Sequence, residues 1–412
     1  MKRIVTIFLS LGVASFAFAQ KDKHDKGGMK PYSNPFMANI KKQLGEFNNK
    51  PKQDDKRFMM DYTNVDIPKS MSEFKTVFTQ PAISQGVTNT CWCFSTLSYY
   101  ETEINRISKQ DIRLSQSYIV YWEYVEKTKE FVRTRGTSAF GEGSESNAVT
   151  RMMKTYGIVP YDSYTGLKPN QPFYDHATLF DELNTYLQNV KASGAWSEDQ
   201  VVATVKSIME FHMGKPPVDV TVNGKTMSPQ AYLNDVCKLN PDDYIEFMSL
   251  MQSPYWTRAE YNVPDNWWHS NDYYNVPLDT WMDIIKKSIK AGYSMAIGGD
   301  VSESGLNPQL GVAMIPSYDI PHDYIDENAR QFRYSNGSTT DDHGIHLCGW
   351  CEKPNGMWFL IKDSGSSSRN NPQNPGYFYY HEDYVKLKMM TFTIHKDAVK
   401  DVLAKFNQPP TK

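Results

Sequence analysis

Two cysteines in the segment QGVTNTCWCFS have the spacing for thiol chemistry at the start of a helix. Cys91 lies in the first turn of a helix predicted for residues 90–109, and Cys93 follows about 200° further round, since each residue turns about 100°. The thiolate is the nucleophilic form of cysteine, and a helix amino terminus or a nearby histidine favours it. We predict Cys91 as a nucleophile and Cys93 as a small buried residue. The alternative is that both thiols are buried packing groups.

Two neighbours of Cys91 are suited to assist it. Gln85 has a side-chain amide that could donate to a developing oxyanion, together with the backbone N–H of Cys91. Trp92 follows Cys91 directly and is expected to shield the site from water. The arrangement indicates acyl transfer by a thiolate.

This segment resembles the Q-x-x-x-x-x-C-W-x-F-S motif of papain-like cysteine peptidases. The matching residues are Gln85, Cys91, Trp92, Phe94 and Ser95. The chain departs from the motif at Asn89-Thr90, near which the family commonly has a small Gly or Ser. The segment HGIHLCGW similarly resembles the family motif H-[AG]-x-x-x-x-G-aromatic. This resemblance implies that His343 is the catalytic base. The competitor His346 has its glycine at the wrong offset and is expected to be a structural residue of the same sheet. The Asp341-Asp342 pair before it either contacts a substrate amine or forms a solvated loop.

The third catalytic position departs from the family. Its usual asparagine, in K-N-S-W-G, is replaced by Asp363 in IKDSGS, and the tryptophan is absent. An aspartate could still accept a hydrogen bond from the imidazole and fix its tautomer, as it does in serine triads. The alternative is that Asp363 caps a turn.

The spacing between nucleophile and base indicates one branch of this family. His343 follows Cys91 by 252 residues (343 − 91), whereas about 130–150 is usual. A largely helical insertion at about residues 150–290, together with segments such as LSQSYIVYWEYVEK and GYFYYHEDYV, resembles the bleomycin hydrolase and aminopeptidase C branch. That resemblance implies a papain-like α+β domain over residues 81–406, aminopeptidase activity, peptide substrates and a hexamer. The resulting candidates for substrate binding are Trp92, Ser144, Asp342 and Lys412.

The pattern along the chain fits this fold class. Helices are predicted first, at residues 90–109, 114–131, 146–156, 178–190 and 198–213. Short apolar runs bounded by Gly, Asn and Pro follow and predict strands at 295–297, 345–350, 358–362 and 377–380, before a closing helix at 397–406. Helices in one half and an antiparallel sheet in the other define an α+β protein.

The amino-terminal region is expected to be separate from this domain. Lys2 and Arg3, a short apolar run and an A-x-A site before Gln20 predict a signal peptide over residues 1–19, and thus a periplasmic or secreted protein. Residues 20–80 are predicted to be a mobile arm or a propeptide, because they are rich in Lys, Asp, Gly, Asn and Pro. No later run is long enough to span a membrane. A formal net charge of −3 gives no case for nucleic acid as the main partner.

Some residues of the sequence also raise other functions. Cys348 and Cys351 form a C-x-x-C pair, which raises thiol–disulfide exchange or zinc binding, but the predicted context is a strand with no second cysteine pair. We therefore expect no metal and no cofactor. A papain-type endopeptidase and a binding protein that has lost catalysis, suggested by Thr90 and Asp363, remain the alternatives to an aminopeptidase.

The family resemblance also implies that the carboxyl-terminal segment, residues 407–412, lies in the substrate cleft and excludes endopeptidase binding. We predict that deleting Pro409–Lys412 lowers aminopeptidase activity and creates endopeptidase activity, measured with free-amine and internally quenched peptides. Unchanged aminopeptidase activity without new endopeptidase activity would contradict this role.

Overall fold

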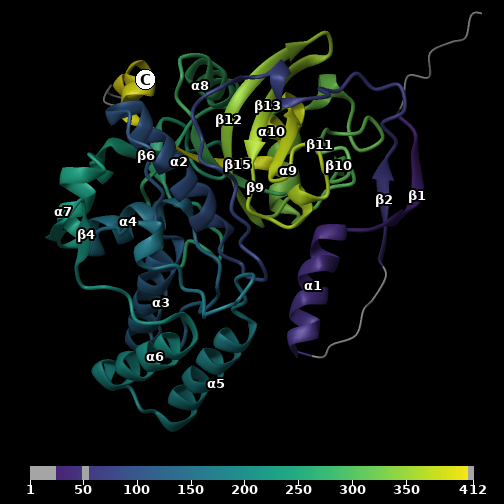
Figure 1. Ribbon diagram of the computed structural model, residues 1–412. Helices are drawn as coiled ribbons and strands as arrows, with labels where there is room; N and C mark the ends of the chain where they lie inside the picture. Colours follow the sequence, from purple (N-terminus) through teal and green to yellow (C-terminus); the bar gives the residue numbers. More distant parts are fainter. Residues whose placement is uncertain (1–24, 49–54, 407–412) are drawn as a thin grey trace, which may run out of the picture.

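The computed structural model describes residues 25–48 and 55–406 (Figure 1). The predicted signal peptide and the carboxyl-terminal segment with Lys412 lie outside these ranges. Within them, no helix combines the length and the apolar character needed to cross a bilayer.

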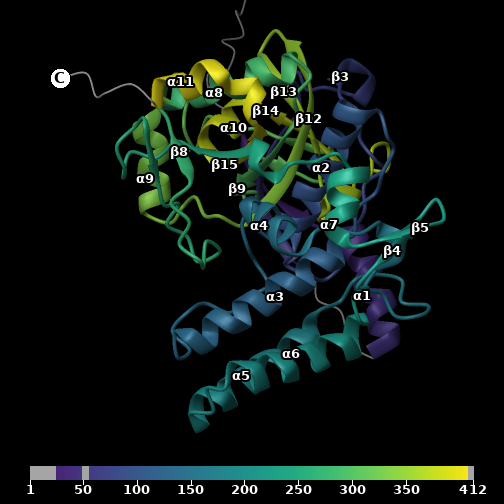
Figure 2. The ribbon, with the colours of Figure 1, turned by 90° about the vertical axis from the view of Figure 1, so that its left-hand side faces the viewer.

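One half of the molecule is helical and is built around a buried central helix, α2. The helices of this half are α2 (Cys91–Ser108), α3 (Gln116–Arg133), α4 (Ser146–Tyr156), α5 (Ala177–Ser193) and α6 (Glu198–Met213). Every residue from Trp92 to Ile104 is buried, which is typical of a helix covered on all sides. The long helices α3, α5 and α6 lie below α2, away from the sheet (Figure 2).

The other half is a single mixed sheet of eleven strands in the order β10-β11-β14-β13-β12-β9-β15-β6-β8-β7, with β3 pairing β12. Its strands are β3 (Lys75–Thr76), β6 (Tyr244–Met248), β7 (Thr257–Ala259), β8 (Tyr273–Asn275), β9 (Met295–Gly299), β10 (Leu306–Asn307), β11 (Val312–Ala313), β12 (His343–Lys353), β13 (Gly356–Lys362), β14 (Tyr377–His381) and β15 (Met389–His395). The described chain also contains α7 (Pro229–Ala231), α8 (Leu278–Lys290), α9 (Glu327–Ser335), α10 (Glu382–Lys388), α11 (Lys400–Phe406) and the β4–β5 hairpin (Val220–Val222 and Lys225–Met227).

The α+β class is confirmed, but the sheet is larger than predicted and not wholly antiparallel. β11 pairs with β14, and β6 with β8, in parallel. β6 and β8 belong to the region predicted as a helical insertion, so that insertion also extends the sheet. Strands of three to five residues in an aromatic, Pro- and Asn-rich segment carry too little alternation to be recognised from sequence.

The two halves meet where α2 crosses the sheet. Along β9, Ala296 belongs to the core that contains α2, whereas Met295 and Ile297 belong to the core that contains α8 on the opposite face. Gly344 of β12 allows the closest approach: a Cβ built there would lie 2.8 Å from Ser95 Oγ and 3.1 Å from the Trp92 Cα. The first turn of α2 and the first residues of β12 are therefore in direct contact.

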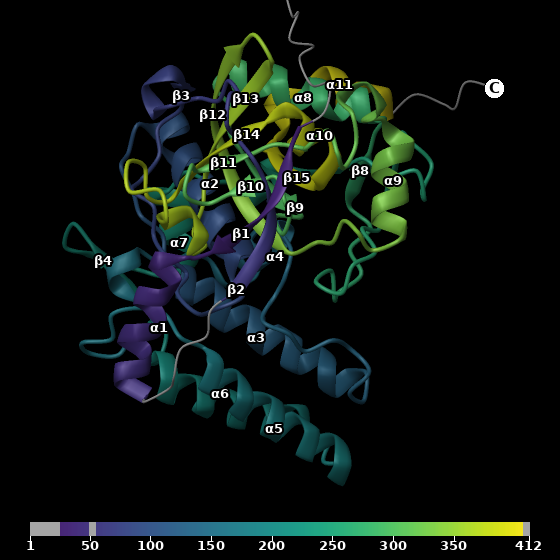
Figure 3. The same cartoon turned by 90° about the vertical axis from the view of Figure 1, so that its right-hand side faces the viewer.

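The described part of the predicted mobile arm forms β3, a short 3-10 turn at Met71–Glu73 and three longer elements. β1 (Gly27–Tyr32) and β2 (Asp55–Met60) pair antiparallel, and α1 (Pro35–Asn48) lies between them in sequence (Figure 3). The Phe36 N–H donates to Asn370 Oδ1 at 2.9 Å, and the Phe36 ring packs edge-on against Phe173 with centroids 5.9 Å apart. The polar composition concealed these elements because a few apolar anchors, rather than a continuous periodic face, attach them to the domain. Removal of residues 20–80 as a propeptide stays a prediction.

Candidate active site

Cys91 is the first residue of α2 and lines a cleft of about 360 Å³ between the two halves. It is half-buried, whereas the other four cysteines are buried. Cys93 donates its S–H to the Gln116 carbonyl at 3.4 Å, inside the helical half. Because the first N–H groups of a helix point outward unpaired, Cys91 lies where a negative charge is stabilised.

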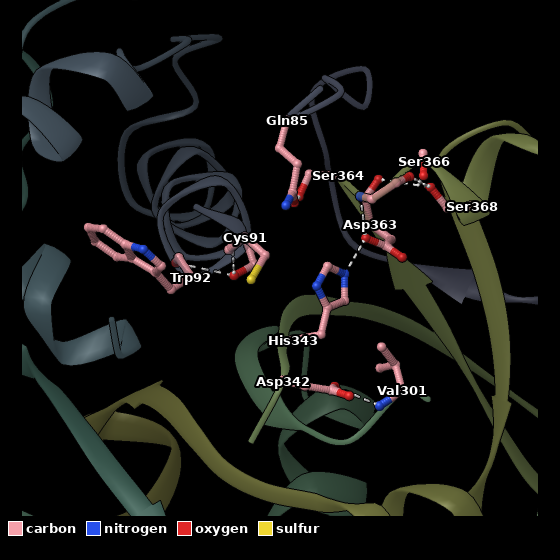
Figure 4. A network of polar contacts seen from close by, with 12 residues as sticks. Gln85, Cys91, Trp92, Val301, Asp342, His343, Asp363, Ser364, Ser366 and Ser368 are labelled. Atoms are coloured by element: carbon pink, nitrogen blue, oxygen red, sulfur yellow. Dashed lines mark hydrogen bonds and ion pairs between the residues drawn. The ribbon is translucent and has the colours of Figure 1, made fainter. Parts of the chain in front are cut away.

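His343 is the first residue of β12 and faces Cys91 across the cleft (Figure 4). Its Nε2 lies 2.8 Å from Asp363 Oδ1, which leaves Nδ1 for the sulfur. Burial disfavours the imidazolium, but the charges of Asp363 and Cys91 and the hydrogen bonds to both outweigh it and raise the pKa of His343 well above its usual value. The histidine therefore retains its proton at neutral pH, which favours a thiolate–imidazolium pair.

Asp363 follows β13 and is only 4% exposed. Its Oδ1 accepts from the Gly365 N–H at 2.7 Å as well as from His343, so Asp363 both orients the imidazole and caps the turn. Although burial opposes ionisation, the charge and hydrogen bond of His343 lower the pKa of Asp363. A Cβ at Gly365 would lie 3.2 Å from Asp363 Oδ1 and 3.4 Å from the His343 ring, so a glycine leaves room beside both groups.

The amide of Gln85 is held in one orientation. Its Oε1 accepts from Ser364 Oγ at 2.7 Å, and its Nε2 donates to the Thr88 carbonyl at 2.7 Å. Gln85 is nearly buried and lines the same cleft as Cys91. One N–H of its side chain therefore remains for a group bound beside the sulfur, as an oxyanion donor requires.

The three predicted substrate-binding residues that the structure describes all line the cleft, but each is already engaged. The indole N–H of Trp92 donates to the Glu142 carbonyl at 3.1 Å. Ser144 Oγ donates to Glu123 at 2.7 Å, and Asp342 accepts from the Val301 N–H at 2.9 Å and from Ser302 Oγ at 2.6 Å. These contacts shape the walls of the cleft.

The residues that would serve as an alternative base, a redox pair or zinc ligands are buried in the interior: His346, Cys348 and Cys351. His346 Nδ1 lies 2.9 Å from Ser98 Oγ in a fully buried position, where burial and Lys362 lower the pKa of His346 well below its usual value. Cys348 and Cys351 belong to a buried apolar cluster on β12. Of the carboxylates in the cleft, sequence reasoning missed Glu145 and Asp265, because nothing in GEGSES or VPDN indicates which long-range neighbours they meet.

The ion pair between His343 and Asp363 predicts a specific pH effect. The catalytic imidazolium is lost as pH rises through the pKa of His343, and Asp363→Asn removes the charge that raises this pKa. We therefore expect the alkaline limb of the pH profile of kcat/KM to move to lower pH, while Asn still accepts the imidazole N–H. Asp363→Ala, which removes that acceptor as well, should lower kcat/KM by about 10- to 100-fold. An unmoved alkaline limb in Asp363→Asn would contradict the electrostatic role.

Comparisons with known proteins identify the family of this chain. The model of the Peptidase C1-like family matches residues 29–155 and 139–412. Aminopeptidase C of Lactococcus lactis subsp. lactis (strain IL1403) is 19% identical over 387 residues, which cover 83% of this chain and 87% of that protein. Aminopeptidase C of Streptococcus thermophilus is 22% identical over 318 residues, which cover 65% and 69%.

A solved structure supports the same fold. The crystal structure of PepW from Lactobacillus rhamnosis HN001 is 18% identical and superposes with a TM-score of 0.66 over 80% of this chain and 83% of that chain. Since the family model matches nearly the whole chain, this protein belongs to the Peptidase C1-like family and is a papain-like cysteine peptidase.

Proposed function

We propose that this peptidase is an aminopeptidase that works through Cys91, His343 and Asp363. The observation that carries the proposal is the half-buried thiol at the start of α2 facing an imidazole that Asp363 holds at 2.8 Å. The similarity to two proteins named Aminopeptidase C over most of the chain supports the exopeptidase character.

In the first half of the reaction, the thiolate of Cys91 attacks the carbonyl carbon of the substrate. A C–S bond forms, and the carbonyl electrons move to oxygen, where Gln85 Nε2 and the Cys91 N–H stabilise the negative charge. The tetrahedral intermediate then collapses, the C–N bond breaks, and the leaving amine takes the proton from Nδ1 of His343. The product is a thioester on Cys91 and a neutral histidine.

In the second half, His343 acts as the base. Its Nδ1 accepts a proton from water while the water oxygen attacks the thioester carbon. When the new intermediate collapses, the C–S bond breaks, the carboxylic acid leaves and the thiolate–imidazolium pair is restored. Asp363 holds the ring in one tautomer throughout and stabilises the imidazolium of the resting state.

The two alternatives make different demands on the site. A binding protein that had lost catalysis would need neither an imidazole held by Asp363 beside Cys91 nor a Gln85 amide held in one orientation. A papain-type endopeptidase would use the same chemistry but would accept substrates with blocked amino groups. The substrate termini therefore distinguish it from an aminopeptidase.

Export and assembly extend this proposal. The basic start and A-x-A site of residues 1–19 support action in the periplasm or outside the cell after cleavage before Gln20. The resemblance to the aminopeptidase C branch supports a homo-oligomer with peptides as the partners of each subunit.

The proposed chemistry predicts that substitution by alanine has very different effects on activity at Cys91 and at Cys93. Cys91→Ala should abolish hydrolysis of aminoacyl-coumarin substrates, because it removes the nucleophile, whereas Cys93→Ala should keep activity within about 3-fold, since it replaces a small buried residue. Substrates with free amino groups should be cleaved and acetylated ones should not.

A thiol-directed epoxide gives a second readout. Mass spectrometry should find one adduct, on Cys91 and not on Cys93. Cleavage of the acetylated substrates would favour the endopeptidase, and an enzyme without activity or adduct would support the binding protein.

A further inference from the structure

One part of the cleft carries more negative charge than the catalytic chemistry uses. Beyond Cys91 and His343, the lining includes four carboxylate residues, Glu145, Asp265, Asp341 and Asp342. Among the described residues that line the cleft, none is a lysine or an arginine. Two glycines leave room there: a Cβ on Gly298 would lie 3.2 Å from Thr391 Oγ1 and 3.8 Å from Asp341 Oδ1, and one on Gly143 would overlap Asp265.

Glu145 has a carboxylate oxygen that is buried and unpaired among the described residues. It is the residue that precedes α4, but its side chain does not cap the helix. The side chain is only 5% exposed, and its Oε1 has no hydrogen-bond partner within the part of the chain that the structure describes. A buried carboxylate oxygen without a donor is costly, so this oxygen is suited to a donor that a ligand supplies.

Asp341 lies against Glu145 and increases the charge of this region. The carboxyl groups of Glu145 and Asp341 lie within hydrogen-bonding reach of each other. Two carboxyl groups form a hydrogen bond only when they share a proton. Burial is the main cause that raises the pKa of Glu145 and the pKa of Asp341, and the surrounding carboxylates raise both further. The pKa of Asp341 rises to about 7. Neither residue forms an ion pair with any residue in the described ranges, whereas Asp265 has the charge of Lys127 nearby. Among the residues that the structure describes, the pair therefore has no positively charged partner.

We propose that Glu145 and Asp341 form a binding site for an organic cation, an ammonium or guanidinium group carried by the peptide substrate. This inference rests on the proposed peptidase function, because the site opens into the cleft of Cys91. The several N–H groups of such a cation donate to both carboxylates, including Oε1 of Glu145, and its charge relieves the repulsion between them. The cation displaces the shared proton, which returns to solvent.

The cation has two possible sources in a peptide, its α-amino group and a lysine or arginine side chain. Binding to the Cys91→Ala variant, which has no nucleophile, distinguishes them by calorimetry with four tripeptide amides. The probes are acetyl-Leu-Ala-Ala, Leu-Ala-Ala with a free amino group, acetyl-Lys-Ala-Ala and acetyl-norleucine-Ala-Ala. Norleucine matches lysine without its charge.

We expect at least one cationic peptide to bind about 10-fold or more tightly than its neutral counterpart, in line with a charge-assisted hydrogen bond. Adding Glu145→Gln or Asp341→Asn should remove this advantage and leave the affinity of the neutral peptides unchanged. Asp283→Asn is the matched control, because it removes one carboxylate from the exposed surface of α8, where Asp283 pairs with Lys287. It should keep the advantage.

The outcomes are separable from those of the catalytic proposal. An advantage that acetylation abolishes identifies the α-amino group, and one that norleucine abolishes identifies the side chain; either supports the site. Equal affinity for charged and neutral peptides, or an advantage that survives both substitutions, overturns it. If one of the two variants fails to fold, as judged by its thermal unfolding, the other decides. Absent hydrolysis by the unmodified enzyme would instead refute the proposed function alone.

Discussion

The site depends on the close contact between the first turn of α2 and the first residues of β12. Gly344 favours this contact, because a Cβ at that position would lie only 2.8 Å from Ser95 Oγ and 3.1 Å from the Trp92 Cα, so the neighbours would have to shift. The contact brings a helix amino terminus from one half of the molecule to a strand end from the other. Neither half contains both Cys91 and His343, so the proposed chemistry depends on the packing of the two halves.

A chain of contacts extends from this point to the amino-terminal segment. Asp363 fixes His343, and Arg369 donates to the carbonyls of Asp363 and Gly365 at 3.3 and 3.0 Å, which holds the turn that carries Asp363. The neighbouring Asn370 accepts from the backbone of Phe36, so α1 supports the same turn from outside. A segment that looks dispensable in the sequence thus lies only a few contacts from the imidazole.

Sequence reasoning was most successful where a motif or a period is local. The bounds predicted for α4 and α6 agree with the structure, because strong periodicity and a following glycine mark both helices. Cys91 and His343 could be proposed as a pair because each lies in a short motif, and the structure brings these two residues together at one cleft. The elements β1, α1 and β2 were missed because their composition is polar, and β6 and β8 because they are very short. The pairing of Glu145 with Asp341 could not be predicted, since it joins positions almost 200 residues apart in sequence.

The distribution of the cysteines has a consequence for oxidative damage. Four of the five thiols are buried in apolar surroundings, and none of the five is joined in a disulfide. Oxidants act on exposed thiolates, so peroxide would first convert Cys91 to a sulfenic acid and leave the interior thiols intact. The oxidised enzyme would be inactive but still folded, and a reductant that reached the cleft would restore its activity.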